Sequence, residues 1–114
     1  MASGEEDRRQ HPRFLCAGEA EIRSLPSGYN RRGKISNLSL SGCLLDLGKG
    51  HSFIRAEAVE MTFTVRQLPV RVQGAIGAHH GETAVGVEFT LLTERGKLQL
   101  LQLIQELAEI IKNR

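Results

Sequence analysis

The fold class is decided by the stretch Thr83-Ala84-Val85-Gly86-Val87-Glu88-Phe89. Val85, Val87 and Phe89 alternate with small or polar residues, which is the period of a strand with one buried face. Gly86 falls on the opposite face, where a glycine indicates a bulge or a close approach of another backbone. We therefore predict a half-buried strand over 83–89 whose apolar side chains point into the core.

Five earlier segments have the same character. The clearest covers 58–65, where Val59, Met61, Phe63 and Val65 share one face. The other four predicted strands are 14–23, 31–38, 43–47 and 68–76, with turns at 25–30 and 77–82 and an unassigned loop at 51–57. Six short strands spaced by about 8–12 residues indicate a mainly β domain, a small antiparallel barrel or sandwich.

The period becomes helical from Thr93. Thr93 is a good N-cap residue, and the carboxylate of Glu94 favours a helix N-terminus, so we predict a C-terminal α-helix over about 93–112. One side of this helix is apolar and consists of Leu100, Leu101, Ile104, Leu107, Ala108 and Ile111. Leu103 and Ile110 widen the apolar arc to about 180°, against the ~100° usual for a surface helix. Burial against the barrel would account for most of this width, and a homodimer contact is an alternative for the rest.

Size and composition restrict the function. A chain of 114 residues fits one domain, and 4% aromatic residues without Trp require an aliphatic core. The net charge of +2 argues against a general polyanion binder, so any affinity for phosphate must be local. Cys16 and Cys43 fit no CxxC or disulfide pattern and are expected to be free, buried thiols. Without a signal peptide or an apolar span of ~20 residues, we expect a soluble, cytoplasmic protein.

Three arginines lie within six residues ahead of the first strand, at Arg8, Arg9 and Arg13. Pro12 removes a backbone donor and disfavours helix at His11, so we predict an extended arm over 1–13 before the barrel domain at 14–114. A guanidinium group pairs bidentately with phosphate oxygens or with the O6/N7 edge of guanine. The alternative is a solvated basic tail.

A second polar motif, Asn37-x-Ser39-x-x-Gly42, joins the second and third predicted strands. Residues two apart on an extended backbone share a face, so with Leu38 and Leu40 in the core we expect Asn37 and Ser39 to point outward. Their amide and hydroxyl groups can read the Watson–Crick edge of a base. Gly42 permits a backbone turn or a close approach of the ligand. The alternative is an ordinary solvated turn.

The order and spacing of the two motifs resemble those of the PilZ domain. An RRxxxR arm (Arg8, Arg9, Arg13) is followed about two dozen residues later by [D/N]xSxxG (Asn37, Ser39, Gly42), and the similarity continues through 85–89 and the final helix. The resemblance implies a six-stranded antiparallel β-barrel that binds cyclic di-GMP. It also implies that the three arginines hold guanine edges and phosphates, that Asn37 and Ser39 contact the other guanine, and that Gly42 shapes the site. A basic Arg8 before Arg9 favours a stacked pair of ligand molecules.

By this resemblance the protein is a receptor, not an enzyme. It would change conformation when the arm closes on the ligand, and would regulate an unidentified protein in motility, biofilm or exopolysaccharide pathways. A nucleic-acid-binding barrel is an alternative, but it needs exposed aromatic residues and Tyr29 is the only Tyr; no DNA or RNA ligand is expected. His11, His51, His79 and His80 have no metal-ligand spacing, which argues against a metal site or an enzyme. An adaptor domain without ligand remains a third alternative.

Overall fold

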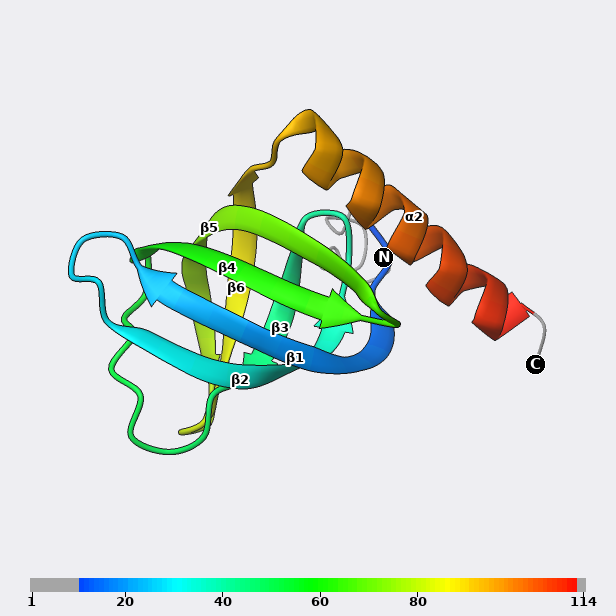
Figure 1. The fold of residues 1–114 in the computed structure, drawn as a ribbon. Helices are drawn as coiled ribbons and strands as arrows, with labels where there is room; N and C mark the ends of the chain where they lie inside the picture. Colours follow the sequence, from blue (N-terminus) through cyan, green and yellow to red (C-terminus); the bar gives the residue numbers. More distant parts are fainter. Residues whose placement is uncertain (1–10, 113–114) are drawn as a thin grey trace, which may run out of the picture.

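The alternating segments pair into one closed sheet. The computed structural model describes residues 11–112. Its elements are β1 (Phe14–Ser24), β2 (Asn30–Leu38), β3 (Gly42–Asp46), β4 (Ala58–Val65), β5 (Leu68–His80), β6 (Ala84–Leu91) and α2 (Glu94–Lys112). The strands pair antiparallel in the order β1-β2-β3-β6-β5-β4, and β4 closes onto β1 (Figure 1). The predicted six-stranded antiparallel β-barrel with a C-terminal helix is confirmed.

The end of β5 differs from the prediction. A turn was expected over 77–82, but β5 continues to His80, so the prediction is wrong for 77–80. The register shifts between Ile76 and His79, which leaves two residues opposite Gly86. This bulge lets the strand bend and stay paired with β6. The turn is reduced to 81–83, where Gly81 has a φ of 71°.

The barrel interior is filled mainly by aliphatic side chains, as the composition predicts. Phe63 and Leu45 are fully buried, and Leu100, Leu103 and Leu107 of α2 belong to the same core. The loop at 51–57 also contributes, because Phe53 is buried with its ring centroid 4.9 Å from that of Tyr29. Cys43 is buried and Cys16 half-buried, and both are free thiols as predicted. Burial raises the pKa of Cys16 to about 11, so it stays protonated at neutral pH.

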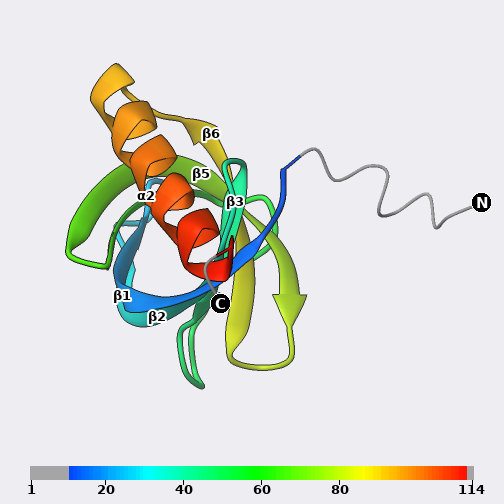
Figure 2. The same cartoon turned by 90° about the vertical axis from the view of Figure 1, so that its right-hand side faces the viewer.

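Helix α2 lies across one side of the barrel and packs on β5 and β1 (Figure 2). Thr93 caps it as predicted, since its Oγ1 accepts a hydrogen bond from the Gly96 amide at 2.9 Å. The buried face is formed by Gly96, Leu100, Leu103 and Leu107.

Two residues of the predicted apolar face, Leu101 and Ile111, are instead 43% and 54% exposed. One residue rotates an α-helix by about 100°, so Leu101 turns away from the barrel when Leu100 faces it. Ile111 lies beyond Leu107, the last buried residue of the helix. No helix within residues 11–112 is long and apolar enough to cross a membrane.

Candidate ligand-binding site

A hollow of ≈ 380 Å³ lies on the outside of the barrel, and we call it the β3–β6 hollow. The end of β2, the turn at 39–41 and the start of β3 form one wall, and the end of β5 with the middle of β6 forms the other. These walls meet because β3 pairs with β6 in the closed barrel. Four predicted site residues line the hollow: Arg13, Asn37, Ser39 and Gly42.

Arg13 is the charged residue from the predicted arm that the structure places at this hollow. It directly precedes β1, and pairing of Phe14 with Leu38 sets it beside the 39–41 turn. Its side chain is exposed and forms no ion pair with any carboxylate of residues 11–112. Among the described residues, its guanidinium group therefore has all its hydrogen-bond donors available. Arg8 and Arg9 lie outside the described residues.

Asn37 supplies a free amide at the same hollow. It is half-buried and lies opposite Leu15 on β1 and Leu44 on β3. Its carboxamide makes no hydrogen bond to another group within the described chain, so donor and acceptor are both available. Leu15 is 83% exposed beside it. An amide can form hydrogen bonds with the edge of a nucleobase, and the apolar side chains of Leu15 and Leu44 on either side of Asn37 can contact the face of the base.

The expectation that Ser39 points outward is wrong. Ser39 is only 4% exposed. Its Oγ accepts a hydrogen bond from the Ser41 amide at 3.1 Å and lies 3.3 Å from the Gly42 carbonyl, to which it donates. Because β2 ends at Leu38, the strand alternation used for the prediction does not extend to Ser39. The Ser39 hydroxyl thus holds the turn that forms one wall of the hollow.

Gly42 is required for a reason that the motif did not reveal. A Cβ at this position would overlap the carbonyl oxygen of Val87 on β6. Its φ is not positive, so the turn geometry does not demand glycine. The close approach of β3 to β6, which brings the two walls together, depends on this missing side chain.

The β5–β6 wall contains residues that the sequence analysis did not assign to the site. Its floor has little side chain, because it consists of Gly77, Ala78 and Gly86. Two side chains border this floor: a Cβ on Gly77 would lie 3.9 Å from Glu88 Cγ, and a Cβ on Gly86 would lie 3.9 Å from His80 Nε2. The sequence analysis did not predict this wall because it assigned residues 77–82 to a turn. The alternation of apolar residues in 83–89 could have indicated it, because this alternation puts Gly86 and Glu88 on the outward face of the strand.

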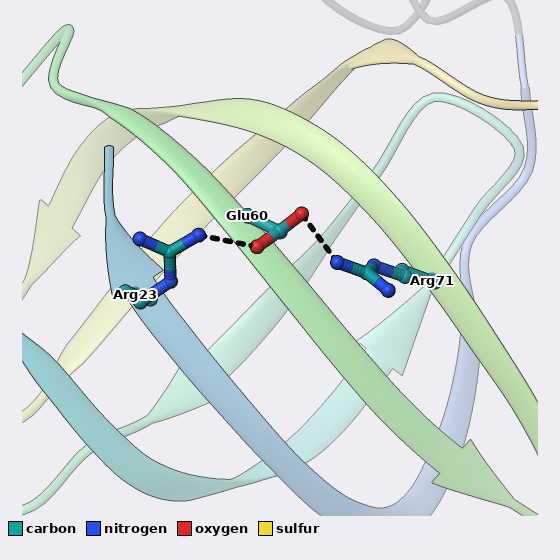
Figure 3. Close-up of polar contacts among 3 residues, drawn as sticks. All are labelled: Arg23, Glu60 and Arg71. Atoms are coloured by element: carbon teal, nitrogen blue, oxygen red, sulfur yellow. Dashed lines mark hydrogen bonds and ion pairs between the residues drawn. The ribbon is translucent and has the colours of Figure 1, made fainter. Parts of the chain in front are cut away.

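A second hollow, of ≈ 240 Å³, lies over β1, β4 and β5, and its charges are paired. Arg23 donates to Glu60 Oε1 at 2.7 Å and Arg71 donates to Glu60 Oε2 at 2.8 Å (Figure 3). We call Arg23, Glu60 and Arg71 the Glu60 cluster. Hydrogen bonds from Arg71 and then Arg23 lower the pKa of Glu60, so its carboxylate stays charged.

The histidines have separate environments. His79 and His80 have different surroundings: His79 Nε2 lies 2.9 Å from the Phe53 carbonyl oxygen, whereas His80 lines the β3–β6 hollow. The His51 ring stacks on His79 at a centroid distance of 5.7 Å. Burial, and then the electrostatic effects of His79 and Arg31, lower the pKa of His51. Within residues 11–112 no three His, Cys, Asp or Glu side chains are grouped so as to hold a metal ion.

Comparison with known families identifies the family to which the chain belongs. The family model for the PilZ domain matches residues 7–106, which is most of the chain. This chain belongs to the PilZ domain family. A comparison with curated protein sequences gave no match.

Solved structures share the PilZ fold at low sequence identity. The PilZ domain of YcgR from Escherichia coli, described with c-di-GMP, has a TM-score of 0.74 at 13% identity, covering 93% of this chain and 95% of its own. The Bacillus subtilis inhibitor of motility MotI/DgrA scores 0.76 at 19% identity, covering 94% and 54%. The K. pneumonia MrkH–c-di-GMP complex scores 0.76 at 14% identity, covering 92% and 53%. The chain thus spans only about half the length of two of these proteins.

Proposed function

We propose that this PilZ domain is a cyclic di-GMP receptor that binds its ligand in the β3–β6 hollow. The observation that carries the proposal is that Arg13 and Asn37, one from each motif, line the same hollow with their polar groups unpaired within residues 11–112. The c-di-GMP named for the PilZ domain of YcgR and for MrkH supports the choice of ligand. None of the five Phe and Tyr side chains is exposed, which disfavours a base-stacking nucleic-acid barrel.

Each residue has a distinct role in this proposal. Arg8, Arg9 and Arg13 hold phosphates and guanine edges, and Asn37 reads a second base. Ser39 and Gly42 act indirectly, by holding the turn and the close β3–β6 pairing. Residues 1–13 close over the hollow when ligand binds, as one molecule or a stacked pair, and this change alters contact with a downstream protein in motility, biofilm or exopolysaccharide control. The exposed side of α2 offers a homodimer contact. The receptor acts in the cytoplasm without catalysis.

Calorimetric titration of the purified chain with cyclic di-GMP tests the proposal. We expect saturable binding at micromolar concentration or tighter, a fitted stoichiometry of one or two ligands per chain, and little binding of single-stranded RNA. Amide hydrogen exchange in the same samples should show new protection over residues 1–13. Absence of saturable binding would exclude the receptor function, and unchanged exchange over 1–13 would exclude closure of the arm.

A further inference from the structure

The geometry assigns to Glu88 the reading of a guanine base that lies on the floor of the β3–β6 hollow. This assignment rests on the proposed cyclic di-GMP function and deepens it, because it names the group that makes the site select guanine over adenine. Glu88 lies outside both sequence motifs of the site.

The floor of the hollow has the shape that a flat base requires. Gly77 and Gly86 carry no side chain and Ala78 only a methyl group, so backbone is exposed across the β5–β6 pair. A Cβ on Gly77 would lie 3.5 Å from the Gly86 carbonyl oxygen, which shows how closely these two backbones approach. Glu88 Cγ lies over Gly77 and His80 Nε2 over Gly86, so two polar side chains stand at the edges of an otherwise bare strip. A base on this strip would present its edge to them.

The Glu88 carboxylate has no cation to neutralise it within the part of the chain that the structure describes. Within residues 11–112 no Lys, Arg or His nitrogen lies within 4.0 Å of it, in contrast to Glu60, which binds two arginines. A free negative charge beside a ligand with two phosphates is unfavourable by Coulomb's law, unless the ligand donates hydrogen bonds to it. If the ligand donated no hydrogen bond to Glu88, the negative charge of this side chain would reduce the affinity of the site for the phosphates of the ligand.

Guanine provides the donors that this carboxylate lacks. Its Watson–Crick edge carries the adjacent N1–H and N2–H groups, which match the two oxygens of a carboxylate, and such charge-assisted bonds are strong. Adenine has an unprotonated N1 at the corresponding place, so its lone pair would face the negative charge. A site built to receive donors discriminates strongly against a ligand without them.

Glu88 and Asn37 would contact different bases of the ligand. Asn37 pairs with Leu44 and Leu44 with Gly86, so two strand spacings, about 10 Å in all, separate Asn37 from the floor. A cyclic dinucleotide carries two bases joined by a phosphate ring. The hollow therefore has one polar reader for each base, with Arg13 supplying positive charge.

The test compares Glu88→Gln with wild type for binding of cyclic di-GMP and cyclic di-AMP by calorimetry. Gln keeps the Cγ over Gly77 and the side-chain length but removes the charge. We expect the affinity for cyclic di-GMP to fall about tenfold or more, because a charge-assisted pair is lost. The affinity for cyclic di-AMP should stay equal or rise, so the ratio of the two affinities, which measures the preference for guanine, should decrease.

Glu82→Gln is the matched control, because Glu82 is an exposed residue of the 81–83 turn that does not line the hollow. It removes the same charge and should leave the preference for guanine unchanged. If wild type binds cyclic di-GMP and Glu88→Gln binds it equally or more tightly, Glu88 is merely a repelling surface charge and the assignment fails while the receptor function stands. If wild type does not bind cyclic di-GMP at all, the receptor function itself fails.

Discussion

Two polar hollows on the outer surface of one barrel differ in how their charges are satisfied. In the Glu60 cluster, each carboxylate oxygen receives one arginine, at 2.7 and 2.8 Å. In the β3–β6 hollow, Arg13, Asn37 and Glu88 make no such pairs within the described chain. Both surfaces are polar and both include arginine, so composition alone does not separate them.

The difference indicates which surface is built for a ligand. Paired charges on a sheet surface contribute a little to stability and already have a partner of opposite charge within the protein. Unpaired donors and acceptors above a floor of small residues contribute nothing to the unliganded fold and are available to a partner. The predictions below test this contrast between a binding surface and a stabilising one.

The largest expected effect concerns Gly42. In Gly42→Ala the new Cβ would overlap the Val87 carbonyl, so β3 and β6 must separate. We expect a loss of about 3 kcal/mol in the free energy of unfolding, the upper part of the range for overpacking, together with loss of cyclic di-GMP binding. Chemical denaturation and calorimetry measure the two quantities.

Gly86→Ala is the matched control for Gly42→Ala. The nearest atom to its Cβ would be the Ala78 carbonyl oxygen at 3.7 Å, an ordinary contact, so stability should change by less than about 0.5 kcal/mol. Its methyl group would nevertheless stand on the floor of the hollow and weaken ligand binding. Wild-type stability of Gly42→Ala, or unchanged binding by Gly86→Ala, would contradict this account of the hollow.

Arg13→Ala and Arg71→Ala remove the same charge from the two surfaces. Loss of Arg13 should reduce cyclic di-GMP affinity at least about tenfold, since a hydrogen bond to a charged group contributes about 1.5–3 kcal/mol. Loss of Arg71 should leave affinity within about twofold, because its partner is Glu60 and bulk charge effects are screened by salt. Calorimetry at physiological ionic strength measures both. Equal losses for the two variants would show that only net charge matters.

Local periodicity was sufficient to predict most of the strands and the helix, whereas the closed barrel was implied by the family resemblance. The alternation in 58–65 predicted β4 with its observed bounds, and Thr93 marked the start of α2. The errors have tertiary causes. The bulge after Ile76 keeps β5 paired with β6, and packing on the barrel selects Leu103 over Leu101 as the buried helix residue. Neither the partner strand nor the packing surface is encoded in a short window.

Part of the candidate site, like most of the strands, could be predicted from the sequence. Arg13, Asn37 and Gly42 belong to recognisable motifs, and the structure places all three at one hollow. Glu88 and His80 were not assigned to the ligand site, because the floor between them exists only after β5 and β6 pair. The Glu60 cluster was missed for the same reason, since Glu60 is 37 residues from Arg23 and 11 from Arg71. Contacts between strands that are distant in sequence can be predicted only when the pairing register of those strands is known. The alternation of apolar and polar residues does not specify that register.

The smallest expected effect concerns the stabilising surface. Glu60→Gln should lower the free energy of unfolding at neutral pH by less than about 1 kcal/mol, because the pairs it breaks are solvent-accessible. Two arginines hold the pKa of Glu60 below its ordinary value of 4.5. A carboxyl group with a lowered pKa in the folded state stabilises the protein above its unfolded pKa, and this contribution disappears as pH falls through the folded value. Urea denaturation of wild type and Glu60→Gln at about pH 7, 4.5 and 3 would measure how this contribution to stability changes with pH.

The difference in stability between wild type and Glu60→Gln should therefore be greatest at neutral pH and vanish in acid. Glu19→Gln provides the control, since Glu19 is exposed on β1, the strand that pairs with β4, and forms no ion pair within the described residues. Its stability should follow that of wild type at each pH. Affinity for cyclic di-GMP should be unchanged in both variants. If Glu60→Gln lost ligand affinity instead of acid-sensitive stability, the paired surface would be part of the binding site, and the contrast between the two hollows would be wrong.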